Sequence, residues 1–296
     1  MQEGFVPALG TPLDDNGDFL RESYVKQIED QLARGAVGLL SMGSMGIQAY
    51  LRPEICPEVA RAAVETAAGR VPVFVGAMDC SVAKVKARMA AMEHLPLTAF
   101  VLTAPFYNRC TPAQMITFFR EAAAATRHGL MLYDLPGVTQ SKITYEVVKA
   151  LLKEAPNLMG IKSADLALFR QLKLDPEVPE DFIMVCSNLD LFDLAYCWGL
   201  KNSLDGMLTV TPANTEKLFR AMKAGDFAQA AGYLNNIVAL RDFMAGHDLW
   251  PSYTVGMNLL GYAGSFGPDY VAPFKEEYRE ALTELMRRIG EPVVGS

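Results

Sequence analysis

Short apolar runs, many of them rich in β-branched residues, recur at fairly even intervals along the first two thirds of the chain. Most of the runs are apolar at nearly every position and do not alternate, which is typical of strands covered on both faces. Between the runs lie segments with apolar residues at helical spacing, such as Val82, Val85, Met89 and Met92. The eight runs cover residues 5–9, 37–41, 71–77, 97–103, 130–133, 158–162, 182–186 and 203–210.

This alternation of strand and helix predicts a parallel sheet. Eight such units within roughly 220 residues fit a closed (β/α)8 barrel better than an open doubly wound sheet. The strand signals stop after residue 225, and helices are predicted at residues 226–245, 253–261 and 273–289. We therefore expect an α/β protein with a (β/α)8 TIM barrel over residues 1–225 and a C-terminal helical appendage over residues 226–296.

Composition and charge exclude several classes of function. The chain has 296 residues, of which 51% are hydrophobic and 21% charged, which is the balance of a globular and not a disordered protein. Its net charge of −7 and the lack of any Lys/Arg run argue against nucleic acid or a membrane surface as partner. Five scattered cysteines and an N-terminus without a signal-like segment favour a cytoplasmic location. The three histidines are also scattered, so neither a metal site nor a metal-dependent aldolase is expected.

Reactive groups in such barrels lie at the C-terminal ends of the strands, and Lys162 is the unusual residue there. It ends a run that is otherwise apolar. An amine removed from water favours its neutral form, which can attack a ketone and form a Schiff base. From position alone, a lysine that simply faces solvent is the commoner interpretation.

Three further strand ends carry candidate chemistry. Tyr133 and Tyr107 each follow a strand, and a phenol beside an amine can transfer the protons of Schiff-base formation. Tyrosines are also ordinary half-buried residues, so neither is decisive alone. Ser44 lies between Gly43 and the Met45-Gly46 pair, in a tight turn that can expose backbone N–H groups to a carboxylate.

Taken together, these strand ends resemble the dihydrodipicolinate synthase/N-acetylneuraminate lyase family of class I aldolases. The resemblance covers essentially the whole chain. It implies a (β/α)8 barrel, a homo-oligomer (dimer or tetramer), small-molecule substrates and no cofactor. The matching segments are Gly43-Ser44-Met45-Gly46, Pro105-Phe106-Tyr107-Asn108-Arg109, Tyr133-Asp134-Leu135-Pro136, Gly160-Ile161-Lys162 and Gly206-Met207-Leu208-Thr209.

The resemblance also implies roles for individual residues. Lys162 would form a Schiff base with pyruvate or a related 2-oxo acid, and Tyr133 would be the general acid/base. Ser44 would link the two tyrosines, and the N–H groups of Ser44 and Met45 would hold the pyruvate carboxylate. Tyr107 would be contributed across the tight dimer interface.

The second half of the site departs from the family pattern. Leu208 matches the residue that lines the pyruvate methyl. Val138 stands where dihydrodipicolinate synthases carry an arginine for the carboxylate of the aldehyde, with Thr139 beside it. Asn188 replaces a usual glycine, and Asp190 matches a residue that touches sugar hydroxyls in the lyase branch.

These features predict a class I aldolase or lyase that joins or separates a 2-oxo acid and a neutral or hydroxylated aldehyde. The missing arginine argues against a true dihydrodipicolinate synthase. That activity remains an alternative, as does a dehydratase or decarboxylating enzyme that uses the same imine. A further alternative is a barrel that binds a 2-oxo acid without turnover, which the methionine at position 45 and the asparagine at position 188 motivate.

Overall fold

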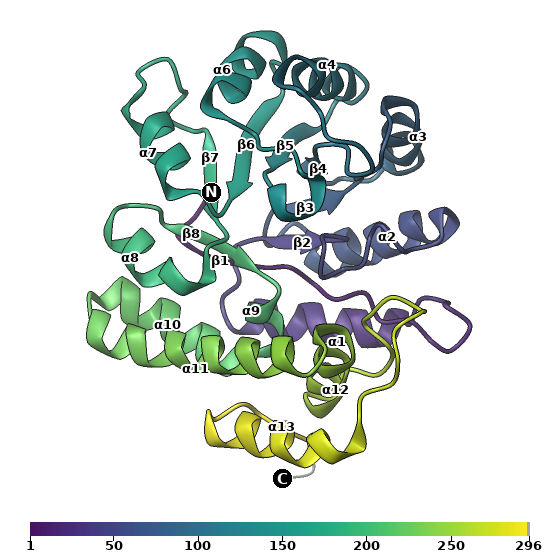
Figure 1. Ribbon diagram of the computed structural model, residues 1–296, viewed down its shortest axis with the longest axis vertical. Coiled ribbons are helices and arrows are strands. Elements are labelled where there is room, and N and C mark those ends of the chain that lie inside the picture. The colour runs from purple at the N-terminus through teal and green to yellow at the C-terminus, as the bar shows by residue number, and fades with distance from the viewer. Residues whose placement is uncertain (295–296) are drawn as a thin grey trace.

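Eight parallel strands lie at the centre of the computed structural model, which describes residues 1–294 (Figure 1). Their order is β1-β8-β7-β6-β5-β4-β3-β2, and a parallel bridge between Ala8 and Leu40 brings β1 and β2 together. The predicted (β/α)8 barrel is therefore confirmed. The strands are β1 (Gly4–Pro7), β2 (Leu39–Ser41), β3 (Val73–Gly76), β4 (Ala99–Thr103), β5 (Gly129–Tyr133), β6 (Leu158–Ser163), β7 (Ile183–Cys186) and β8 (Asn202–Asp205).

Helices surround the barrel between successive strands. The main ones are α1 (Arg21–Ala33), α2 (Cys56–Ala67), α3 (Val82–Met92), α4 (Pro112–Ala123), α6 (Tyr145–Glu154), α7 (Leu166–Leu174), α8 (Phe192–Cys197) and α10 (Pro212–Ala224). Short helical turns lie in the connections: η1 (Pro53–Ile55), α5 (Pro136–Thr139), η2 (Leu189–Leu191) and α9 (Met207–Val210).

The expected C-terminal helical part is present as α11 (Phe227–Gly246), α12 (Leu249–Leu259) and α13 (Glu276–Arg288). α11 lies along α10, and α13 is outermost (Figure 1). The second helix begins four residues earlier than predicted, because a proline at position 251 is tolerated in the first turn of a helix. Within residues 1–294, no helix is both long enough and apolar enough to cross a bilayer. We retain the division at residue 225, between α10 and α11, as our proposal for the domain organisation.

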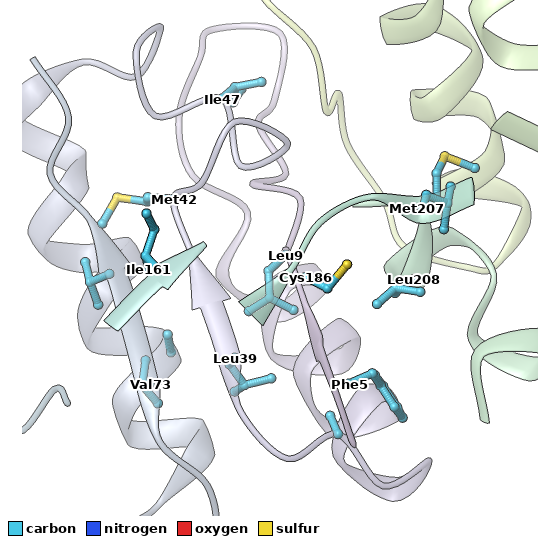
Figure 2. Packing of buried hydrophobic residues seen from close by; sticks show 14 of the residues in the cluster. Phe5, Leu9, Leu39, Met42, Ile47, Val73, Ile161, Cys186, Met207 and Leu208 are labelled. Atoms are coloured by element: carbon cyan, nitrogen blue, oxygen red, sulfur yellow. The ribbon is translucent and has the colours of Figure 1, made fainter. Parts of the chain in front are cut away.

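Two apolar layers account for the unbroken apolar runs, since alternate side chains of a strand face opposite sides. One layer packs between the strands and the surrounding helices, and Figure 2 shows part of it. The other, here called the interior cluster, fills the barrel itself. Its members include Val6, Ala8, Leu40, Phe74, Ala99, Val101, Met131, Tyr133, Val185 and Leu204.

The eighth predicted run is wrong in its second half. β8 ends at Asp205, and Met207–Val210 forms the short helix α9 instead of continuing the strand. The Asp205 side chain accepts a hydrogen bond from the N–H of Met207 (2.8 Å), which satisfies a donor at the start of this helix. The apolar run continues because the residues of α9 are themselves buried.

The end of the chain is fastened to the last barrel helix. Glu291 is 5% exposed, and its two carboxylate oxygens accept hydrogen bonds from the N–H groups of Ala213 (2.9 Å) and Asn214 (3.0 Å). These donors lie in the first turn of α10, where the helix itself offers them no partner. The C-terminal helices are thereby held against the barrel that they cover.

Candidate active site

Lys162 reaches into the barrel from the end of β6. The residue is 5% exposed, and its Nζ lies 3.6 Å from the centre of the Tyr133 ring. β5 and β6 pair with Tyr133 opposite Lys162, so both side chains stand at one level of the barrel. The solvent-facing interpretation of Lys162 is therefore wrong, and the amine is placed where water is largely excluded.

The turn after β2 brings a hydroxyl and two free amides to the same place. Ser44 Oγ donates a hydrogen bond to the Tyr133 hydroxyl at 3.4 Å. Within residues 1–294, the backbone N–H groups of Ser44 and Met45 meet no acceptor. Adjacent unpaired N–H groups in a turn can bind an anion such as a carboxylate.

This turn is held in an unusual backbone conformation. Met42 and Ile47 both have positive φ values, of 53° and 49°, and a β-branched residue rarely adopts this region. The conformation is fixed from outside, because the Thr11 hydroxyl donates to the Gly46 carbonyl at 2.8 Å. Strained backbone that surrounding contacts hold in place is typical of functional sites.

Met45 fills part of the barrel mouth. Its side chain packs against the interior cluster and lies over Gly206, so close that a Cβ at position 206 would be 2.0 Å from Met45 Cγ. Only glycine fits at position 206 while Met45 keeps this position. The methionine contributes apolar surface and no hydroxyl to the mouth.

Asp134 supports the pair formed by Lys162 and Tyr133. This buried carboxylate accepts hydrogen bonds from Ser163 Oγ (2.8 Å) and from the N–H of Ile143 (3.0 Å), and it forms an ion pair with Lys142. Asp134 directly follows Tyr133 in the chain, and its hydrogen-bond partner Ser163 directly follows Lys162. It therefore ties the ends of β5 and β6 together at the level of the amine.

Asp134→Ala should lower the free energy of unfolding by about 3 kcal/mol, because it leaves the buried hydroxyl of Ser163 and the amide of Ile143 without an acceptor. We also expect kcat to fall, because the ends of β5 and β6, which position Tyr133 and Lys162, lose the carboxylate that joins them. Asp165→Asn is the matched control, because Asp165 is the other, more exposed partner of Lys142. Chemical denaturation and initial rates measure both effects, and equal losses in the two variants would contradict a special role for Asp134.

Asp205 and Arg241 are charged residues near the site that the sequence reasoning missed. Burial is the largest influence on Asp205 and raises the pKa of its carboxyl. The positive charges of Lys162 and Arg241 oppose this shift, which places both cations within electrostatic reach. The sequence signal that could have identified Asp205 is its place directly before the glycine at position 206. Arg241, in α11, was not foreseeable because no local pattern relates that helix to the barrel mouth.

Two candidate substrate-binding residues are already engaged with the protein. Both oxygens of Asp190 receive hydrogen bonds from Arg241 at 2.8 Å, and this guanidinium holds the pKa of the Asp190 carboxyl below its usual value. Thr139 is buried, and its hydroxyl lies 3.1 Å from the Leu135 carbonyl and 3.0 Å from the Ser141 carbonyl. Both side chains are therefore already hydrogen-bonded within the protein in this conformation, and their binding roles stay predictions.

The other candidates are dispersed around the mouth. Tyr107 is 83% exposed and Val138 is 57% exposed, so both point away from the interior of the single chain. Asn188 is half-buried, and its amide donates to the Ala164 carbonyl at 3.1 Å. Leu208 is fully buried in the layer between barrel and helices, beyond the end of β8 (Figure 2). The roles of these residues also stay predictions.

The described part of the chain has no group of three or more His, Cys, Asp or Glu side chains placed to hold a metal ion. The groups that converge on the barrel interior are instead an amine, a phenol and hydroxyls. Such a set suits covalent chemistry on a carbonyl compound with proton transfer.

Comparisons with known proteins agree with this geometry. A family model described as the dihydrodipicolinate synthetase family matches residues 1–289. A 4-hydroxy-tetrahydrodipicolinate synthase from Exiguobacterium sp. (strain ATCC BAA-1283 / AT1b) is 30% identical over 230 residues, which is 78% of each chain. A protein of the same name from Anaeromyxobacter sp. (strain Fw109-5) is 29% identical over 290 residues, or 97% of each chain.

Solved structures share the fold over the whole length. Dihydrodipicolinate synthase from Aquifex aeolicus superposes with a TM-score of 0.88 at 21% identity, covering 99% of this chain and 100% of that chain. A prophage protein of the dihydrodipicolinic acid synthase family from E. coli K12, solved with pyruvate, gives a TM-score of 0.87 at 22% identity, covering 98% and 99%. The family model spans nearly the entire sequence, so the chain belongs to the dihydrodipicolinate synthetase family.

Proposed function

We propose that this chain is a lyase in which Lys162 forms a Schiff base with pyruvate or a related 2-oxo acid. Members of the family are pyruvate-dependent class I aldolases and lyases. The observation that carries the proposal is the buried Lys162 amine, 3.6 Å from the centre of the Tyr133 ring, with the hydroxyl of that tyrosine in contact with Ser44.

The proposed cycle begins with attack of the Lys162 amine on the 2-oxo carbon. The carbinolamine loses water, and Tyr133 delivers the proton that the departing hydroxide needs. In the cleavage direction, the Tyr133 phenolate takes the proton of the C4 hydroxyl while the electrons of the C3–C4 bond move toward the iminium nitrogen, which gives an enamine and releases an aldehyde. Protonation of the enamine at C3 and hydrolysis of the imine then return pyruvate and the free lysine.

The carboxylate of the 2-oxo acid would bind at the turn after β2. The unpaired N–H groups of Ser44 and Met45 support this position, as does the Ser44 hydroxyl beside Tyr133. A carboxylate held there would lie near the Lys162 amine, since all of these groups converge on Tyr133. Binding in a fixed orientation converts the attack into an effectively intramolecular step.

The second substrate is proposed to be a neutral or hydroxylated aldehyde. Val138 supplies no charge at the mouth, and Arg241 is neutralised by its ion pairs with Asp190 and Asp242. A second anionic substrate would therefore find no unpaired cation among these residues. This distinguishes the proposal from dihydrodipicolinate synthase activity, which the names of the relatives keep as the alternative.

Reductive trapping tests the proposed function directly. The protein is incubated with pyruvate and borohydride, weighed intact and mapped by peptide analysis, with release of pyruvate from 4-hydroxy-2-oxo acids followed in parallel. We expect one adduct, on Lys162, together with pyruvate release. An adduct without turnover on any acid or aldehyde would support the non-catalytic binding protein, and dehydrated or decarboxylated products would support the other enzymatic alternatives. Absence of any adduct would overturn the proposal.

Val138→Arg tests the choice of second substrate. The new guanidinium should raise kcat/KM roughly tenfold for an aldehyde that carries a carboxylate, because it adds a charge-assisted hydrogen bond. A neutral aldehyde should react as before. Val138→Gln is the control for side-chain length, and steady-state kinetics with the paired aldehydes is the measurement. A high rate of the unchanged protein with the anionic aldehyde would contradict our assignment.

Tyr107 supports a homo-oligomer as part of the proposal. A tyrosine that is 83% exposed beside a barrel mouth can act on the site of another copy, as the family resemblance implies. Light scattering in solution determines whether the protein is a dimer or a tetramer.

A further inference from the structure

Thr103 is the last residue of β4, and its hydroxyl is buried without a partner. The residue is 3% exposed. Among the residues that the structure describes, none forms a hydrogen bond with Thr103 Oγ1. Nearly all buried hydroxyls in proteins are hydrogen-bonded, so an unpaired one calls for an explanation.

The register of the sheet shows that this hydroxyl belongs to the barrel interior. Ala99 and Val101 are members of the interior cluster, and residues two apart on a strand share a face, which puts Thr103 on the same inner side. In the parallel pairing of β4 with β5, Thr103 stands opposite Tyr133. Tyr133 in turn stands opposite Lys162 on β6.

The order of the strands fixes the side of Tyr133 on which Thr103 lies. β4 lies between β5 and the strands β3 and β2, whereas β6 lies on the other side of β5. Thr103 is thus on the side of Tyr133 away from Lys162 and toward the turn that carries Ser44. That turn reaches back to Tyr133, since Ser44 Oγ contacts the phenol at 3.4 Å.

We propose that the Thr103 hydroxyl binds the carboxylate of the 2-oxo acid that is attached to Lys162. This inference rests on the proposed function and adds a residue to its substrate site. A carboxylate has two oxygens that accept several hydrogen bonds, and the turn after β2 supplies only one side-chain hydroxyl, because position 45 is methionine. Thr103 supplies a second hydroxyl, from a position in β4 that lies just before the family-like segment at residues 105–109.

The test compares Thr103→Val, which keeps the branched shape and removes the hydroxyl, with Thr103→Ser, which keeps the hydroxyl. Borohydride trapping is measured as a function of concentration with pyruvate and with acetone, a ketone that lacks the carboxylate. We expect T103V to trap pyruvate roughly tenfold less efficiently, because one hydrogen bond to a charged group is lost, and to trap acetone as the unchanged protein does. T103S should retain most of the efficiency with pyruvate.

Two further readouts separate a binding role from a structural one. T103V should be at least as stable to heat as the unchanged protein, because it removes an unsatisfied buried group. The rise in melting temperature caused by pyruvate should be smaller in T103V.

The possible failures are distinguishable. Equal trapping of pyruvate by T103V and the unchanged protein overturns this inference and leaves the proposed function intact, as does an equal loss with acetone. No trapping by the unchanged protein overturns both.

Discussion

Lys162→Ala is expected to abolish the reducible adduct with pyruvate and to lower turnover by at least about a thousandfold. The reason is that Lys162 is the only buried lysine within residues 1–294, and the amine of the nearby Lys142 is already paired with Asp134 and Asp165. Lys162→Arg should be equally inactive, because a guanidinium stays protonated and is not a nucleophile. Intact-protein mass after borohydride reduction and steady-state rates on a 4-hydroxy-2-oxo acid measure the two losses.

The variants must stay folded for this result to be informative. Lys162→Met keeps much of the side-chain volume and removes a polar group from the interior, so its thermal stability should not fall. Lys86→Ala is the matched control, because this half-exposed lysine of α3 pairs only with Glu121. An adduct of unchanged mass in Lys162→Ala, or turnover close to that of the unchanged protein, would show that the Schiff base forms elsewhere or not at all.

The sequence predicted the barrel because its strands carry their signal locally. Side chains that point inward are buried in the interior cluster, and those that point outward are buried against the helices. A strand is therefore apolar at nearly every position. The same rule failed after Asp205, since the residues of α9 are buried by neighbouring helices and continue the run as a helix. Residues of both kinds of element are buried, and the hydrogen bond from the Met207 N–H to Asp205 marks where the strand gives way to the helix.

The centre of the site was also predictable, for a related reason. Lys162 and Tyr133 end consecutive strands, and parallel strands in register bring consecutive ends together without any knowledge of distant contacts. The resemblance assigned Asp190 to the hydroxyls of a substrate, and the sequence could not show its ion pair with Arg241, which is 51 residues away in α11. Residues that depend on such distant packing are not visible in a local pattern.

Thr103 shows a third limit of prediction from the sequence. Its position at the end of an apolar run is ordinary, and nothing in the sequence says that its hydroxyl lacks a partner. That property emerges only from the three-dimensional arrangement, in which no group among residues 1–294 forms a hydrogen bond with it. Unpaired buried groups of this kind are therefore found by structure and not by motif.

Tyr133→Phe is expected to reduce kcat by roughly 10²–10⁴-fold while the fold and the adduct on Lys162 are retained. The ring remains, so the contact of the amine with the aromatic face at 3.6 Å is preserved. Only the hydroxyl is lost, and with it the group that would transfer protons during formation and breakdown of the carbinolamine. The adduct should accordingly form more slowly but reach the same final amount when borohydride is added after a long incubation.

A matched control and a partner variant sharpen this test. Tyr262→Phe also removes a buried tyrosine hydroxyl, here one that bonds to Asp30 at 2.9 Å, and should leave kcat unchanged. Ser44→Ala should reduce kcat less than Tyr133→Phe, because the Ser44 contact at 3.4 Å is long for a hydrogen bond between hydroxyls. Single-turnover trapping and steady-state rates measure these effects. Wild-type kcat in Tyr133→Phe would mean that proton transfer proceeds through solvent or another group, since the amine would still have its aromatic neighbour and its carbonyl substrate.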